Sequence, residues 1–257
     1  MSQQNKNSPF LSSRPLLFAV FLFLFLASCS VSRTKNYFDP NFRCVSGPGW
    51  RDGKDFLKYK LNVWNLFRAH YREENQRIKN AKIVVTGNSL ALLFLPQMEK
   101  ELPKMGVVNR AIGGDMTETL LERLDEDVLS LSPSTIIIEI GGNDMIYTKC
   151  LPETQANVEA IVAKIHSKQP STQIIFIAVP PTRVPELNQI VPVYNLYLKD
   201  FAKEKKNVRY VEVWDEMKKQ DEPSLKEEYF RESGDPIHFN DKGYEVWGRK
   251  LRPLLRK

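Results

Sequence analysis

The chain has 257 residues, of which 42% are hydrophobic and 26% are charged. This composition is ordinary for a globular protein and excludes a disordered one, and the length suffices for one α/β domain with a sizeable core. The net charge is +6, to which Lys6 and Arg14 near the N-terminus contribute two. The remaining excess of basic over acidic residues is modest and is spread along the chain. It therefore argues against nucleic-acid binding and is compatible with work beside an anionic membrane surface.

Residues 1–28 have the pattern of a targeting segment. The two basic residues are followed by an uninterrupted apolar run, Leu16–Leu26, which has the length of a secretory signal and is too short to span a membrane as a helix of about 20 residues. The run ends in Leu26-Ala27-Ser28-Cys29, which resembles a bacterial lipobox. We expect residues 1–28 to be a lipoprotein signal peptide. Lipid on Cys29 would then anchor an exported protein in the cell envelope, at the periplasmic face or the outer membrane. The alternative is an ordinary secretory signal with an incidental cysteine.

Residues 29–52 are polar and are interrupted by prolines and glycines, so we expect a tether that leads to a domain over residues 53–257. Two further cysteines follow, Cys44 and Cys150. They could pair in an exported protein, but a free buried thiol at Cys150 is equally compatible with the sequence. No CxxC or histidine-rich spacing indicates a metal, and we expect no cofactor.

Strands and helices alternate along the predicted domain. An amphipathic helix over residues 54–79 carries an aromatic stripe that we expect to pack on the sheet. The predicted strands are 83–85, 107–108, 135–140, 173–179 and 208–213, and the predicted helices are 90–102, 117–129, 153–167, 193–205 and 241–255, the last interrupted at Pro253. Strands that are polar on neither face indicate a parallel sheet covered on both sides. The pattern therefore predicts an α/β fold, a three-layer α/β/α sandwich with a flavodoxin-like, doubly wound sheet of about five parallel strands.

The stretch Ala81–Phe94 contains a strand that turns sharply into a helix. Gly87 and Asn88 end the apolar run, and Ser89 follows. This turn places Ser89 at the carboxyl edge of the sheet, beside helix N–H groups that favour negative charge. Ser89 is either a nucleophile or simply the N-cap of the following helix, since serine is a preferred cap.

Three later loops carry polar groups to the same edge. Glycine pairs occur in Ile112-Gly113-Gly114-Asp115 and in Gly141-Gly142-Asn143-Asp144. In Asp235-Pro236-Ile237-His238, the Asp-Pro start favours a type I turn that brings the carboxylate to the imidazole. A serine nucleophile needs such a base and an anion that orients it. The alternative is a turn with a surface histidine. The other two histidines, His70 and His166, are expected on helix surfaces.

Together these four segments, spread in order over roughly residues 80–250, resemble the SGNH hydrolase family of GDSL-type esterases and lipases. The neighbourhood Asn109–Leu124 particularly resembles its lysophospholipase-like and platelet-activating-factor acetylhydrolase-like branch. The resemblance implies that Ser89 is the nucleophile and that Asp235 and His238 complete a triad. It also implies an oxyanion hole made by the backbone amides of Ser89 and Gly114 and the side chain of Asn143. Two residues depart from the family: Asn88 replaces the usual aspartate, and Ala111 stands where a glycine is common.

The activity implied is that of a serine esterase, without metal or cofactor, which hydrolyses acyl or acetyl esters of lipids or carbohydrates. Three competing classes lack their motifs. The G-x-S-x-G elbow of an α/β-hydrolase is missing because Ala91 follows Leu90. A metallophosphoesterase needs more histidine ligands than the three in this chain. A flavodoxin-like nucleotide-binding protein would share the sheet, but the glycine pairs match no phosphate-binding loop. A catalytically silent surface lipoprotein for binding or adhesion stays open, as do the substrate and the oligomeric state. Pocket size is expected to depend on the loops Met145–Pro152 and Pro180–Glu186.

Overall fold

The computed structural model describes residues 35–79 and 81–255, and the chain from Lys35 onward forms one compact unit. Its centre is a five-stranded sheet in the order β2-β1-β3-β4-β5, in which every neighbouring pair is parallel. The strands are β1 Ile83–Gly87, β2 Val107–Asn109, β3 Thr135–Glu139, β4 Gln173–Ile177 and β5 Val208–Val211. The strand order reverses between β1 and β3, the place where flavodoxin-like sheets bind ligands. The predicted α/β class is confirmed.

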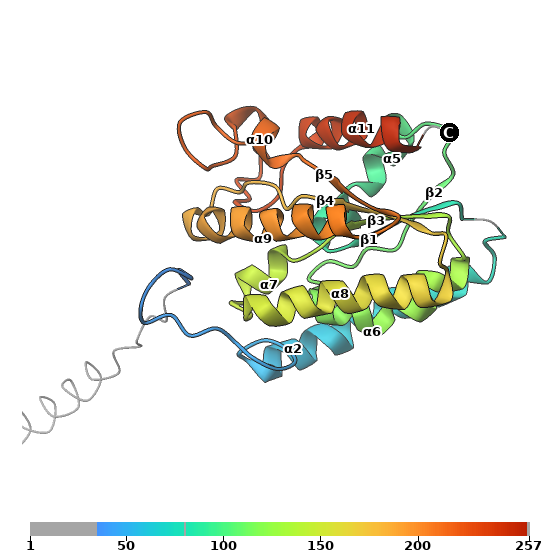
Figure 1. Ribbon diagram of the computed structural model, residues 1–257, viewed down its shortest axis with the longest axis horizontal. Helices are drawn as coiled ribbons and strands as arrows, with labels where there is room; N and C mark the ends of the chain where they lie inside the picture. The colour runs from blue at the N-terminus through green and yellow to red at the C-terminus, as the bar shows by residue number, and fades with distance from the viewer. Residues whose placement is uncertain (1–34, 80, 256–257) are drawn as a thin grey trace, which may run out of the picture. The chain divides into compact units, whose positions relative to one another are not determined.

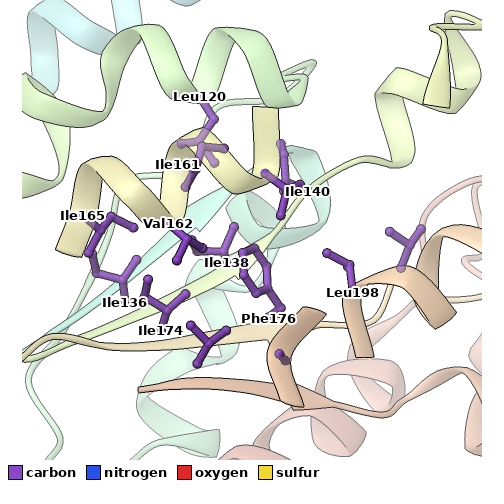
Figure 2. Packing of buried hydrophobic residues seen from close by; sticks show 14 of the residues in the cluster. Leu120, Ile136, Ile138, Ile140, Ile161, Val162, Ile165, Ile174, Phe176 and Leu198 are labelled. Carbon is purple, nitrogen blue, oxygen red and sulfur yellow. The ribbon is translucent and has the colours of Figure 1, made fainter. Parts of the chain in front are cut away.

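Helices cover both faces of the sheet, as Figure 1 shows for α6 and α8 on one side and α5 and α11 on the other. One face carries α6 Thr117–Asp127, α8 Leu151–Lys168 and α9 Pro185–Glu204, and the other carries α4 Ser89–Leu93, α5 Met98–Glu101 and α11 Asp241–Leu255. Successive strand residues point to opposite faces. Ile136 and Ile138 pack toward α6 and α8 (Figure 2), whereas Ile137 packs into the opposite cluster. A single β-branched strand therefore supplies side chains to the hydrophobic core on both faces of the sheet.

The N-terminal helix differs from the prediction in shape and in packing. It consists of α2 Gly53–Tyr59, a π-helical turn η1 Lys60–Trp64 and α3 Asn65–Asn75. Its buried aromatic residues Tyr59, Trp64 and Tyr71 pack around Ile112, in the loop after β2, rather than on the sheet. The helix therefore lies against a loop that leads to the candidate site.

Prolines explain where helix boundaries depart from the prediction. The helix expected over 90–102 is divided into α4, the 3-10 turn η2 Leu95–Gln97 and α5, because Pro96 has no N–H to donate. Conversely, α9 begins at Pro185 and continues through Pro192, and α11 continues through Pro253 in its last turn. Proline suits the first turn of a helix. In α9, the packing of the buried side chains outweighs the cost of the backbone hydrogen bond that the internal proline cannot donate. Four short elements were not predicted: η3 Leu129–Leu131, α7 Gly142–Ile146, α10 Trp214–Met217 and η4 Glu227–Tyr229.

Residues 35–52, expected to belong to a free tether, instead form a strap that packs on the domain. A disulfide joins Cys44 to Cys150, so the pairing that the sequence left open is formed. The strap also pairs with the chain before α8, since the N–H of Val45 donates to the carbonyl of Thr148 over 2.7 Å. The ring of Trp50 stacks on that of Tyr147 with 4.1 Å between centroids.

The predicted signal peptide, Cys29 and the start of the expected tether lie outside the described residues. Within residues 35–79 and 81–255, no helix combines the length and the hydropathy needed to cross a membrane.

Candidate functional site

The turn between β1 and α4 holds Ser89 at the carboxyl edge of the sheet. Gly87 has φ +132°, and a Cβ there would lie 1.8 Å from the carbonyl oxygen of Glu139, so only glycine allows β1 and β3 to approach so closely. Asn88 is the N-cap of α4, because its Oδ1 accepts from the N–H of Leu90 over 2.8 Å. The interpretation of Ser89 as the cap is therefore wrong: Ser89 is the first residue of the helix.

The structure brings Ser89, His238 and Asp235 into one hydrogen-bonded line. The Oγ of Ser89 lies 2.7 Å from Nε2 of His238, although 149 residues separate them in sequence. Nδ1 of His238 lies 2.7 Å from Oδ2 of Asp235. With Nδ1–H donating to the carboxylate, Nε2 is the nitrogen left to accept a proton from the serine hydroxyl.

Asp235 is held as an anion by its own turn. Its Oδ1 accepts from the backbone N–H groups of Ile237 over 2.8 Å and of His238 over 3.1 Å. Partial burial raises the pKa of Asp235, but these hydrogen bonds and the one from the His238 side chain outweigh it and leave the pKa below its ordinary value. A carboxylate that stays charged can orient the imidazole and stabilise its protonated form.

Asn143 and the second glycine loop lie near Ser89. Asn143 lies in α7, and its Nδ2 donates to the carbonyl of Asp115 over 2.9 Å. The amide nitrogen carries two N–H groups, so this bond orients the side chain and leaves the second N–H for a ligand. A Cβ on Gly113 would lie 3.8 Å from the Cβ of Ser89. Gly114 has φ +88°, and a Cβ there would lie 2.7 Å from the ring of Tyr59, so the second loop also requires glycine.

A buried ion pair supports this second loop. The carboxylate of Asp115 lies 2.7 Å from the Arg123 guanidinium, and both side chains are fully buried. Asp115 also accepts from the indole N–H of Trp64 over 3.0 Å and from the hydroxyl of Tyr59 over 3.3 Å. The N-terminal helix therefore stabilises the loop that carries Gly114. Sequence reasoning did not connect this helix with the site, because the contact joins segments more than 50 residues apart.

A small cavity of about 20 Å³ opens beside Ser89. Asn143 and Thr182 contribute polar groups, and the apolar walls are Leu90, Ile146, Val179, Pro180, Leu187, Val191 and Ile237. Ile146 and Pro180 belong to the two loops that the sequence predicted to determine the size of the pocket. Leu187 and Val191 were missed because they belong to the early turns of α9, and Pro185 as a helix start was the signal that could have placed them. Gly114 does not line this cavity.

Known proteins resemble this chain in part of its sequence and in its fold. The family model described as GDSL-like Lipase/Acylhydrolase family matches residues 85–246, more than half of the chain. Among curated proteins, platelet-activating factor acetylhydrolase IB subunit alpha2 of Homo sapiens is 31% identical over 106 residues, and that of Rattus norvegicus is 29% identical. Each match covers 40% of this chain and 45% of the relative, so the chain spans less than half the length of these curated relatives.

Solved structures agree over a larger share of the chain. A structure described as a candidate platelet activating factor from Streptococcus pneumonia has a TM-score of 0.71 at 24% identity and covers 79% of this chain and 97% of its own. A GDSL-like lipase from Bacteroides thetaiotaomicron has a TM-score of 0.65 at 20% identity, covering 73% and 96%. A catalytic mutant of an acetylxylan esterase from Geobacillus stearothermophilus has a TM-score of 0.53 at 18% identity, covering 70% and 97%. At these identities the structures show a shared fold.

Proposed function

The chain belongs to the GDSL-like lipase/acylhydrolase family of hydrolases, and on that premise we propose that it is a serine esterase that cleaves carboxylic esters through an acyl-enzyme on Ser89. The observation that carries the proposal is the hydrogen-bonded line from Ser89 through His238 to Asp235, with 2.7 Å at each contact. Because His238 is held between an anion and a hydroxyl, it has the geometry of a general base.

The reaction follows from this geometry. Nε2 of His238 takes the proton of the Ser89 hydroxyl while Oγ attacks the ester carbonyl, and Asp235 stabilises the imidazolium that forms. The backbone N–H groups of Ser89 and Gly114 and the side-chain amide of Asn143 donate to the oxyanion. His238 then protonates the leaving alcohol, and a water molecule activated in the same way releases the acid.

The size of the cavity beside Ser89 supports a short acyl group. Its volume of about 20 Å³ holds roughly one water-sized group, which suits the methyl of an acetyl ester. A longer chain would have to displace the side chains of Ile146, Leu187 and Val191. The names of two relatives, an acetylhydrolase and an acetylxylan esterase, also refer to acetyl esters. We therefore infer acetyl esters of lipids or carbohydrates as the substrate class.

A fluorophosphonate probe tests the serine chemistry and separates the esterase from a silent binding protein. The full chain is expected to be labelled, and Ser89→Ala and His238→Ala are expected to abolish labelling and ester hydrolysis. Ser167→Ala and His70→Ala, at exposed positions on other helices, serve as matched controls. Labelling that survives Ser89→Ala, or wild-type protein that reacts with neither probe nor ester, contradicts the proposal.

A panel of p-nitrophenyl esters from C2 to C16 tests the acyl pocket. We expect kcat/KM to be highest for C2 and at least about tenfold lower for C8, because lost fit in a small apolar pocket costs about 1–3 kcal/mol per extra group. Val191→Ala enlarges the cavity and should shift the optimum toward C4. The control Val193→Ala changes an exposed residue of the same helix. Equal rates along the series would contradict the acetyl assignment and leave the serine mechanism intact.

We further propose that a lipid on Cys29 holds the enzyme at a membrane of the bacterial cell envelope. The support is the lipobox-like sequence that ends the apolar run.

A further inference from the structure

A buried acid lies beneath the turn that carries Ser89. Glu139 is the last residue of β3, its side chain is fully buried, and neither of its carboxyl oxygens makes a well-formed hydrogen bond to the described part of the chain. Burial raises the pKa of Glu139 to about 8. The nearby Asn88 side chain favours the charged form, but too weakly to offset burial. Glu139 is therefore neutral at pH 7, and the mechanism above does not use it.

Two further titratable groups, on elements that pack against the sheet, lie close enough to this carboxyl to be affected by its charge. Burial raises the pKa values of Tyr194 in α9 and Tyr244 in α11, and negative charge on Glu139 would raise both further. The hydroxyl of Tyr244 donates to the carbonyl of Leu90 over 3.0 Å, in the first turn of α4. The hydroxyl of Tyr194 has no partner among the described residues. Ionisation of Glu139 would thus place an unpaired charge in the protein interior.

Asn88 connects this cluster to the nucleophile. Gly87 pairs with Glu139 in the sheet, and the backbone N–H of Asn88 donates to the carbonyl of Glu139 over 3.2 Å. Because Oδ1 of Asn88 accepts from the N–H of Leu90, its NH₂ group is the part of the amide left to face the carboxyl. An aspartate at position 88 has no N–H to offer and would bring a second carboxyl group against the first.

We propose that Glu139 is a positioning residue for Ser89: its neutral carboxyl group faces the Asn88 amide and so stabilises the turn, and asparagine at position 88 is the complement of this buried acid. The inference rests on the proposed esterase function. It also has a pH consequence. Above about pH 8 Glu139 becomes negatively charged next to the turn that carries Ser89, and this charge opposes the developing oxyanion, so kcat falls.

Four forms of the full chain test the pairing: wild type, Asn88→Asp, Glu139→Gln and the double variant, with kcat and KM for p-nitrophenyl acetate measured from pH 5 to 9.5. Asn88→Asp is expected to lower kcat at pH 8 by at least about tenfold, with KM little changed, because two carboxyl groups in one site resist joint ionisation. Adding Glu139→Gln should restore kcat to within about threefold of Glu139→Gln alone, since the new amide can donate to the carboxylate introduced at position 88. Glu139→Gln alone should remove the alkaline fall in kcat.

The controls separate this inference from its premise. Ser89→Ala serves as the blank at every pH, and esterase activity that survives it contradicts the proposed function. If Ser89→Ala is inactive but Glu139→Gln neither rescues Asn88→Asp nor changes the alkaline limb, the positioning role is wrong and the esterase assignment stands. Glu99→Gln, an exposed acid, controls for the loss of one charge. If Asn88→Asp fails to fold in thermal unfolding, the pH profile of Glu139→Gln decides alone.

Discussion

Single side chains at the carboxyl edge of the sheet have distinct tasks. Asn143 uses one N–H to bind the carbonyl of Asp115, and this bond aims the other N–H toward the cavity that it shares with Ser89. A donor held in this way costs little reorganisation when charge develops on the substrate oxygen. In the proposed mechanism, this side chain therefore acts on the transition state more than on substrate binding.

Asn143→Ala is expected to lower kcat by about 10²- to 10³-fold, as the loss of one oxyanion donor does in other serine hydrolases, with a much smaller change in KM. Steady-state kinetics on p-nitrophenyl acetate measures both parameters. Asn62→Ala, an exposed asparagine of the N-terminal helix, is the matched control. Wild-type turnover by Asn143→Ala would remove this residue from the oxyanion site.

The two residues that depart from the family pattern are also explained at this scale. Asn88 keeps the capping oxygen that an aspartate would supply and adds an N–H. Ala111 is not among the positive-φ residues of the described chain, so alanine needs no unusual backbone conformation there. Its N–H donates to Oδ1 of Asn109 over 2.9 Å and its carbonyl accepts from the Tyr71 hydroxyl. Neither departure removes a group that the chemistry needs.

At the scale of elements, the strap of residues 35–52 stabilises the start of α8 and the end of α7. The buried ammonium of Lys149 donates to the carbonyl oxygens of Gly47 and Gly49 and lies 3.3 Å from the Glu118 carboxylate. The Cys44–Cys150 disulfide closes a loop with a sequence separation of 106 residues. Cross-links over long loops restrict the unfolded chain most, so this bond should contribute measurably to stability.

Replacing Cys44 and Cys150 together by serine is expected to lower the free energy of unfolding by about 2–5 kcal/mol, as the loss of a native disulfide typically does. Denaturant unfolding of oxidised wild type and the double variant measures the difference. Each single variant should match the double one, because either removes the bond. Equal midpoints for wild type with and without reductant would contradict the prediction.

For the molecule as a whole, the proposed lipid on Cys29 would attach the compact unit to a membrane. Cys29→Ala is expected to move the protein from the membrane fraction to the soluble fraction and to abolish incorporation of labelled fatty acid. Cys44→Ser, which changes a cysteine of the strap, should leave both measurements unchanged. Fractionation and labelling that Cys29→Ala does not alter would exclude the lipoprotein assignment.

Much of the fold was predictable because it depends on local pattern. The runs at Ile136–Ile138 and Ile174–Ile177 are apolar on both faces, and in a single chain this indicates a strand buried on both sides. The early start of α9 and the continuity of α11 through Pro253 were not predictable, because packing of buried side chains outweighs the helix-breaking tendency of Pro192 and Pro253. The packing of the strap was not predictable because its polar sequence, interrupted by prolines and glycines, resembles a linker, whereas its attachment depends on a cysteine more than 100 residues away.

The sequence by itself determined the α/β class, the serine at the end of the first strand and the local meeting of Asp235 with His238, because each rests on neighbouring residues and a short turn. Only the tertiary structure decided that His238 reaches Ser89, that Trp64 and Tyr59 support the glycine loop, and that the cavity beside Ser89 is small. It also placed Glu139 opposite Gly87, next to Asn88. These contacts join segments that are far apart in the chain. Their distance in space is set by the packing of the sheet and its helices, and no local sequence pattern reports it.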